Sequence, residues 1–324
     1  MLTVFVATYN GAPRLPRVLA AYTQLRSPAG GWKLVVIDNG SSDDSWRIAA
    51  SFADRLPLVC LSEPRRGKNR ALNSALGELE GDLAVFSDDD NVPDPDWLEQ
   101  LRSAADRHRD FGIFGGAIAP LFSAPPDDWI VQWVPLIAVF GITDSAWEEG
   151  PCEPTQVFGG NMAVRAAYLR AGHRFDERIG PDGTSTYAMG GETEFTLRLE
   201  IAEQVACWHC KAARVRTIIS PTMTKRSWII KRAFRLGRCI YRESRQKAAA
   251  GRPHVARGPV QLAAGLAGAI STWARGSLRR DARQAFLGRW TLNLWSGCLV
   301  EAALSWPGAR PLNVRAPVRG RAMP

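Results

Sequence analysis

Three consecutive carboxylates follow a short apolar run. Asp88, Asp89 and Asp90 stand directly behind residues 82–86, whose sequence DLAVF is typical of a buried strand. Carboxylate oxygens are the ligands that hard divalent cations prefer. In an open α/β sheet, ligands bind beyond the carboxyl ends of the strands, so a cation held here could grip the phosphates of a nucleotide. The alternative is a solvated acidic turn that leads into a helix capped near Asp94.

Short apolar runs rich in strand formers recur through the first part of the chain, at residues 2–7, 33–37, 57–61, 82–86 and 112–118. Segments long enough for crossover helices lie between them. This alternation predicts an α/β fold with a mostly parallel, twisted sheet and helices on both faces. The polar loops after the strands, which include residues 8–10 and 38–40, should therefore gather with the acidic triplet at one edge of the sheet.

No glycine-rich phosphate fingerprint of the dinucleotide or P-loop kind occurs in the sequence. Neutralisation of a bound phosphate must therefore come from a metal ion and from basic side chains. Lys68 and Arg66, in a glycine-containing segment that opens a helix, are candidates for this role, although single basic residues are equally well explained by surface solvation.

The charge is distributed unevenly. Residues 225–324 carry 20 Lys and Arg against 3 Asp and Glu, which leaves 21 basic and 29 acidic side chains for residues 1–224. Such an asymmetry indicates a tail that faces a polyanion, either nucleic acid or an anionic membrane surface.

The six cysteines show no paired framework, and the apolar run at residues 2–7 is too short for a signal peptide. These features favour a reducing, cytosolic location. Cys207 and Cys210 have the spacing of half a zinc site or a redox pair, but no second pair with ligand spacing exists, so a buried strand with incidental thiols is the preferred interpretation.

Several blocks occur in a fixed order: VFVATYNG, VVIDNGSSDDS, RRGKNRALNSAL, FSDDDNVPDPDWL, FGGNMAVR and GGETEF. This succession resembles the inverting family 2 glycosyltransferases, which have the GT-A fold. The resemblance covers about residues 1–225 and implies a catalytic domain over residues 1–224.

The resemblance implies a binding site for a nucleoside diphosphate sugar. Thr8 and Tyr9 would lie near the nucleotide, with Tyr9 at its base, and Asp38 would recognise the base or the ribose. Asp89 would contact the ribose. Taken alone, Tyr9 could be a packing aromatic and Asp38 a helix-entry cap.

The same resemblance implies that Asp88 and Asp90 hold Mg²⁺ or Mn²⁺. Many relatives add a histidine ligand after the last strand of this domain, where this chain has Arg216-Thr217-Ile218. Either the ion has fewer protein ligands, which Mg²⁺ tolerates because it keeps waters and phosphate oxygens, or the alignment slips locally.

Residues 190–195, GGETEF, open an amphipathic helix. Glu192 aligns with the acid that acts as general base in the family, and Gly191 stands where a further acid often precedes it. Glu194, the second carboxylate of this turn, is a candidate contact for the acceptor or the donor sugar. Both glutamates could instead simply favour a helix N-terminus. Gly160 and Asn161 resemble the family's floor for the acceptor and the donor sugar, although a plain tight turn would also explain them.

From Lys225 the sequence becomes basic. Apolar residues at 229, 233, 236 and 240 alternate with basic ones in a pattern that predicts an amphipathic helix lying on something anionic. Two later apolar runs, residues 261–270 and 291–306, are too short to span a bilayer, and Glu301 interrupts the second. We therefore expect a helical extension over residues 225–310 that associates with the membrane surface or packs on the catalytic core. Residues 311–324 are expected to be disordered.

These features lead to one hypothesis: a metal-assisted, inverting glycosyltransferase at the cytoplasmic face of a membrane. Its donor would be a nucleoside diphosphate sugar and its acceptor a hydroxyl of a glycan or glycolipid, with no nucleic acid partner. A metal-dependent nucleotidyltransferase and a non-catalytic polyanion-binding protein are the alternatives. The sequence does not specify the sugar, the base or the linkage.

Overall fold

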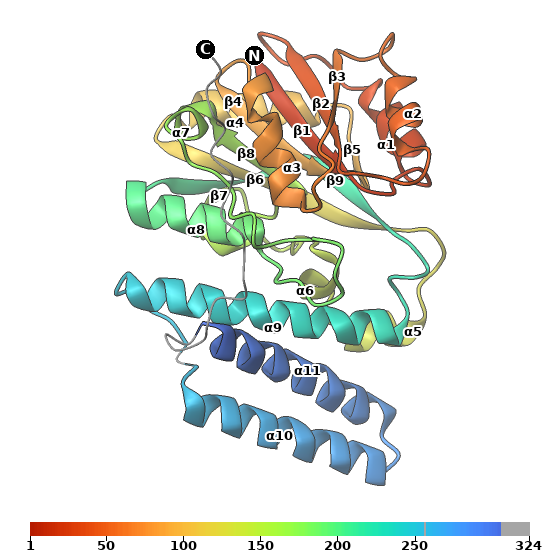
Figure 1. Ribbon diagram of the computed structural model, residues 1–324, viewed down its shortest axis with the longest axis vertical. Helices are drawn as coiled ribbons and strands as arrows, with labels where there is room; N and C mark the ends of the chain where they lie inside the picture. Colours follow the sequence, from red (N-terminus) through yellow and green to blue (C-terminus); the bar gives the residue numbers. More distant parts are fainter. Residues whose placement is uncertain (256, 306–324) are drawn as a thin grey trace, which may run out of the picture.

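The structure is a computed structural model, and it describes residues 1–255 and 257–305. Figure 1 shows an α/β part that carries the sheet and, beside it, a layer of three long helices. The predicted tail, residues 311–324, lies outside the described residues, as do residues 306–310 of the predicted extension.

The described part of the chain has one sheet of nine strands. The strands are β1 (Leu2–Thr8), β2 (Trp32–Asp38), β3 (Leu58–Ser62), β4 (Leu83–Asp88), β5 (Asn91–Pro93), β6 (Phe111–Phe122), β7 (Gly150–Cys152), β8 (Asn161–Arg165) and β9 (Ala206–Ile219). Their order is β3-β2-β1-β4-β8-β6-β9-β5, and β7 pairs with β9. The first four strands in this order are parallel, and β8 runs antiparallel between β4 and β6.

Helices cover both faces of this sheet (Figure 1). They are α1 (Leu15–Tyr22), α2 (Ser45–Ala50), α3 (Lys68–Ser74), α4 (Trp97–Arg107), α5 (Asp128–Trp133), α6 (Leu136–Phe140), α7 (Ala166–Arg170) and α8 (Gly191–Glu203), with short 3₁₀ turns η1 (Ala75–Glu78) and η2 (Pro154–Gln156). The predicted α/β fold is thereby confirmed.

The sheet has a separate hydrophobic core on each face, because successive side chains of a strand point to opposite sides. In β1, Val4 and Val6 pack with α1 and α4, whereas Phe5 packs on the opposite face with α3 and α8. Burial on both faces explains why the strands read as continuous apolar runs in the sequence.

The strand register brings the polar strand ends together. Thr8 of β1 lies opposite Asp38 of β2, and Ala7 lies opposite Asp88 of β4. The loops that follow β1, β2 and β4 therefore leave the sheet side by side, at the edge where the sequence pattern predicts a ligand site.

Three helices form the C-terminal extension: α9 (Arg226–Ala249), α10 (Pro259–Leu278) and α11 (Ala282–Leu304). Helix α9 lies against the α/β part, α11 packs on α9, and α10 is outermost (Figure 1). Gly237 of α9 allows a close approach, because a Cβ atom there would lie 1.9 Å from the Leu294 carbonyl oxygen of α11. No helix among the described residues is both long and apolar enough to cross a membrane.

The sequence pattern predicts that the basic residues of α9 lie on something anionic, and most of them face the protein. Arg238 and Arg242 pair with Glu301 of α11, at 2.7 Å and 2.6 Å, and Glu301 is only 2% exposed. Arg232 and Arg235 pack against the Trp228 ring, at 5.7 Å and 5.8 Å from its centroid. The pattern identifies the polar face of the helix but not what covers it.

Candidate active site

A cavity of about 640 Å³ lies beyond the carboxyl ends of β1 and β4. It is lined by many residues that the sequence singles out, namely Thr8, Tyr9, Arg66, Lys68, Asp88, Asp89, Asp90, Gly160 and Glu192. We refer to this cavity as the cleft. The cleft combines side chains from β1, β4, α3 and α8 with the loops beside them.

The three acids of the triplet have different surroundings. Asp88 forms an ion pair with Lys68. Asp89 Oδ2 accepts hydrogen bonds from Thr8 Oγ1 (2.6 Å) and from Arg14 Nη2 (2.8 Å). Thr8 and Asp89, both expected at the nucleotide, thus bind each other, and Asp90 forms no ion pair within the described residues.

Asp90 carries the excess negative charge of the cluster. Burial, together with the charges of Asp88 and Asp89, raises the pKa of Asp90 to about 7, against the opposing effect of Arg14 and Lys68. Such a carboxyl group holds a proton readily when no other cation is near. One more positive charge would therefore reduce the electrostatic repulsion within the triplet.

Lys68 is held among these acids by the start of α3. Burial lowers the pKa of Lys68, but the Asp88 and Glu192 carboxylates more than offset this effect and raise its pKa above the ordinary value. The Lys68 ammonium group is therefore charged at neutral pH. Its attraction to both carboxylates places Lys68 between the strand-end acids and Glu192.

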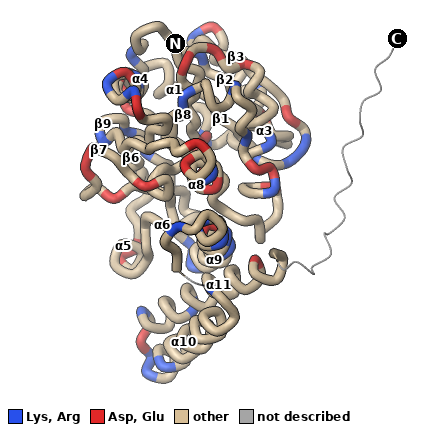
Figure 2. The backbone as a smooth tube through the Cα atoms, turned by 90° about the vertical axis from the view of Figure 1, so that its left-hand side faces the viewer, with Lys and Arg blue, Asp and Glu red and all other residues tan. Residues whose placement is uncertain are grey.

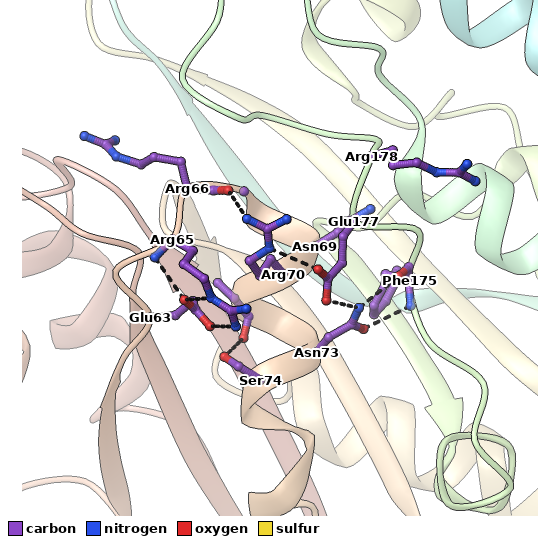
Figure 3. Close-up of polar contacts among 12 residues, drawn as sticks. Glu63, Arg65, Arg66, Asn69, Arg70, Asn73, Ser74, Phe175, Glu177 and Arg178 are labelled. Atoms are coloured by element: carbon purple, nitrogen blue, oxygen red, sulfur yellow. Dashed lines mark hydrogen bonds and ion pairs between the residues drawn. The ribbon is translucent and has the colours of Figure 1, made fainter. Parts of the chain in front are cut away.

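Helix α3 is fixed by the segment before α8. Asn73 Nδ2 donates to the Phe175 carbonyl (2.9 Å) and Asn73 Oδ1 accepts from the Phe175 amide (3.0 Å), while Arg70 pairs with Glu177 at 3.0 Å. Figure 3 shows this network and the Arg66 side chain pointing away from it. The network links the chain on the two sides of the cleft.

Glu192 lines the cleft from the first turn of α8. The helix begins after Gly190, which has a left-handed φ of 82°. Gly191 lies so close to Asn69 that a Cβ atom would approach Asn69 Nδ2 to 2.4 Å. Close packing on α3 thus explains why a glycine stands where relatives of the implied family often have an acid.

Glu194 does not lie in the cleft, which corrects the expectation for this residue. Its carboxylate pairs with Arg198 at 2.7 Å on the outer side of α8. Two residues along a helix correspond to a rotation of about 200°, so the side chains of Glu192 and Glu194 point in nearly opposite directions.

Gly160 borders the cleft, whereas Asn161 does not line it. A Cβ atom on Gly160 would lie 2.5 Å from Asn91 Nδ2, so a larger residue here would displace the Asn91 side chain. Asn161 is fully buried: its Oδ1 accepts from Trp97 Nε1 (2.8 Å) and its Nδ2 donates to the Ala117 and Ala213 carbonyls. With these hydrogen bonds made inside the protein, Asn161 positions Gly160 rather than contacting a sugar.

The far end of the cleft has an exposed aromatic ring. Tyr9 is 41% exposed, and the Arg66 guanidinium lies 3.5 Å from its ring centroid. Asp38 is nearly buried beneath the adjoining loop and does not line the cleft. Its Oδ2 accepts from the Ser41 amide (3.3 Å), whereas its buried Oδ1 has no partner among the described residues. An unpartnered buried oxygen at this position can accept a hydrogen bond from a ligand.

Several cleft residues were not predicted from the sequence. Arg14 pairs with Asp89. Asn91 Nδ2 donates to the Gly160 carbonyl (2.8 Å), while its buried Oδ1 has no partner within residues 1–255 and 257–305. Trp228 and Arg232 reach the cleft from α9. Asn91 follows the triplet directly and could have been found by extending the motif, whereas the α9 residues carry no such signal.

The donor atoms fit a hard cation with few protein ligands. No group of three or more His, Cys, Asp or Glu side chains that could hold a metal ion occurs within residues 1–255 and 257–305. Asp88 and Asp90 offer carboxylate oxygens, and the raised pKa of Asp90 indicates a shortage of positive charge there. Mg²⁺ and Mn²⁺ commonly complete such a shell with water and substrate phosphates.

The parallel strands, the reversed β8 and the strand-end acids define the protein as having a transferase fold of the GT-A type. A solved structure with this fold is the mannosyltransferase PcManGT from Pyrobaculum calidifontis in complex with GDP-Man and Mn²⁺. The two share 19% identity with a TM-score of 0.57, over 93% of this chain and 86% of that one.

Residues 3–144 match the profile of Glycosyl transferase family 2. The glycosyltransferase AglE of Haloferax volcanii is 29% identical over 102 residues, 31% of this chain and 33% of the relative. The undecaprenyl-phosphate 4-deoxy-4-formamido-L-arabinose transferase of Salmonella paratyphi B is 28% identical over 109 residues, 32% of this chain and 33% of the relative. The match thus spans about a third of each curated relative. The resemblance seen in the sequence blocks is confirmed.

Proposed function

We propose that the protein transfers a sugar from a nucleoside diphosphate sugar to a hydroxyl group of an acceptor. One observation supports this proposal above the others: the cleft unites Asp88 and Asp90 with Glu192 around Gly160. Departure of a diphosphate requires positive charge on one side of the reacting carbon, and attack by a hydroxyl requires a base on the other.

The donor would lie along the strand ends. Tyr9 and Arg66 offer a face on which a base can stack, and the unpartnered Oδ1 of Asp38 can accept a hydrogen bond from the base or the ribose. Asp89 would reach the ribose with the oxygen that Thr8 and Arg14 leave free. Lys68 would stabilise the diphosphate as a charged donor.

Asp88 and Asp90 would hold a Mg²⁺ or Mn²⁺ ion. A bound ion supplies charge neutralisation for the leaving diphosphate. Lys68 already neutralises Asp88 in part, so Asp90 would be the carboxylate that depends most on the cation.

Glu192 would act as the general base. It would remove the proton of the acceptor hydroxyl as that oxygen forms a bond to the anomeric carbon and the bond from that carbon to the diphosphate breaks. Attack from the side opposite the leaving group inverts the configuration. Gly159 keeps space beside the carboxylate, because a Cβ atom there would lie 3.2 Å from Glu192 Cβ.

The acceptor would be a glycan or a glycolipid at an anionic membrane surface. The outer face of α10 exposes large apolar side chains, with Val260 76% and Leu278 84% exposed. Exposed arginines follow at one end, at positions 275, 279, 280 and 283. Figure 2 shows the Lys and Arg positions gathered at this end of α10. Apolar side chains bordered by arginines complement a bilayer that contains anionic lipids.

Such a surface would place the protein at the cytoplasmic face of a membrane. All six cysteines are free thiols, which agrees with a reducing compartment.

A transfer assay with radiolabelled nucleotide sugars and a membrane extract as acceptor tests this function. The wild-type protein should transfer label and release a nucleoside diphosphate. Asp90→Asn should abolish transfer, and Glu192→Gln should lower its rate by a factor of about 10² to 10⁴. Full activity in both variants would disprove the mechanism, and release of pyrophosphate would identify a nucleotidyltransferase instead.

A further inference from the structure

The extension contributes directly to the wall of the cleft. Trp228 and Arg232, both on α9, line the same cavity as Asp90 and Glu192. They lie outside residues 3–144, the part of the chain that matches the family profile. A helix from the extension thus faces the reacting groups.

Arg232 differs from the other basic residues of the cleft. Arg14 and Lys68 each pair with an aspartate, and Arg66 stacks on Tyr9. Within the part of the chain that the structure describes, Arg232 forms no ion pair, and its buried Nε has no hydrogen-bond acceptor. A buried donor without a partner destabilises a protein unless a ligand supplies the acceptor.

Aromatic packing holds Arg232 in place. Its guanidinium lies 5.7 Å from the Trp228 ring centroid, and Arg235 lies 5.8 Å from the same ring. Trp228 in turn stacks on Phe140 of α6 with an interplanar angle of 13°. Arg235 also packs on Tyr187, another residue of the cleft wall, at 4.7 Å. These contacts fix the direction of Arg232 but do not neutralise it.

We propose that Arg232 binds a phosphate group of a substrate in the cleft, so that the helical extension completes the active site. A guanidinium forms charge-assisted hydrogen bonds with phosphate oxygens, and it stays charged at every physiological pH. The phosphate belongs either to the diphosphate of the donor or to a phosphorylated acceptor. The inference rests on the proposed function, because that function supplies both kinds of phosphate.

The test compares Arg232→Ala and Arg232→Lys with Lys231→Ala in the full-length chain. Lys231 is the exposed neighbour on the same helix and does not line the cleft, so its variant controls for a general loss of positive charge. Binding of UDP and GDP with Mn²⁺, and binding of a polyprenyl phosphate in detergent micelles, are measured by calorimetry. Thermal unfolding confirms that each variant is folded.

We expect Arg232→Ala to lower the affinity for one of these ligands by a factor of about 10 to 100, as for a lost hydrogen bond to a charged group. Lys231→Ala should lower the affinity for none of them. Arg232→Lys should recover part of the affinity. Loss of nucleotide affinity assigns the phosphate to the donor, whereas loss of polyprenyl phosphate affinity alone assigns it to the acceptor.

Unchanged affinity for all ligands in a folded Arg232→Ala variant would overturn the inference and leave the proposed transfer intact. Binding is measured without turnover, so the two ideas can fail separately. A wild-type protein that binds these ligands through Arg232 but transfers no sugar would contradict the proposed function alone.

Discussion

Two of the three acids in the triplet are already neutralised within the protein. Lys68 pairs with Asp88, and Thr8 and Arg14 bind Asp89, which leaves Asp90 as the acid without a direct cation in the part of the chain that the structure describes. At the scale of single residues, the chemistry of the cleft therefore depends on Asp90 for the metal ion and on Glu192 for the proton.

Asp90→Asn should change how stability depends on pH. The pKa of Asp90 rises from its ordinary 3.8 to about 7 in the metal-free fold, so the folded state binds this proton more tightly than the unfolded state. Stability contributed by the proton is present below about pH 4 and is lost as pH rises toward 7. The asparagine variant should therefore have the higher melting temperature at pH 8 in EDTA.

Thermal unfolding in EDTA between pH 5 and 8 measures this difference. Equal loss of stability by the wild-type protein and the asparagine variant across this range would show that the pKa of Asp90 is not raised in the folded state.

Glu192→Gln should lower the transfer rate by a factor of about 10² to 10⁴, the usual contribution of a general base. Affinity for the nucleotide donor should stay unchanged, because the base acts on the acceptor. Glu194→Gln is the matched control, since Glu194 lies on the same turn but pairs with Arg198 outside the cleft. Equal losses in the two variants, measured by single-turnover transfer, would contradict the assignment.

At the scale of elements, much of the fold was predictable. Strands β1, β2 and β4 are buried on both faces, and this environment produces the apolar runs from which they were predicted. The start of α8 was predictable from its glycines and glutamates. The role of Asn161 was not, because the buried indole of Trp97 that binds it lies 64 positions away in the sequence.

The sequence also does not predict what packs against α9. Periodicity separates an apolar from a basic face, but it cannot distinguish a membrane from a carboxylate of the same chain. Glu301, which interrupts an apolar run in the sequence, is that carboxylate, and it joins α9 to α11.

Glu301→Gln should destabilise the extension by about 3–5 kcal/mol, because two largely buried guanidinium groups lose their counter-charge. Glu148→Gln is the control: the Glu148 side chain is 81% exposed beside Lys211, and its loss should cost less than about 1 kcal/mol. Thermal unfolding and trypsin digestion of α9 to α11 measure both effects. Equal stability of the two variants would mean that the buried pairs do not hold the extension.

At the scale of the whole molecule, the helical layer has two surfaces with different roles in the proposed function. Helix α9 contributes Trp228 and Arg232 to the cleft, and α10, which exposes large apolar side chains, lies outermost (Figure 1). The protein and an acceptor anchored in a bilayer would then lie at the same membrane surface.

Binding to vesicles tests this arrangement. The protein should sediment with vesicles that contain anionic lipids, less so at high salt, and little with neutral vesicles. Ile270→Ser combined with Trp273→Ser should reduce binding severalfold, because both side chains are exposed on α10. Sedimentation unaffected by these substitutions and by salt would exclude α10 as the contact surface.

Cation-dependent donor binding tests the central claim most directly. The melting temperature of the purified protein is measured against a panel of nucleoside diphosphate sugars, with and without Mn²⁺. We predict that at least one donor stabilises the wild-type protein only when Mn²⁺ is present, and that Asp90→Asn abolishes this effect. Absence of any cation-dependent stabilisation in a folded wild-type sample would contradict the account.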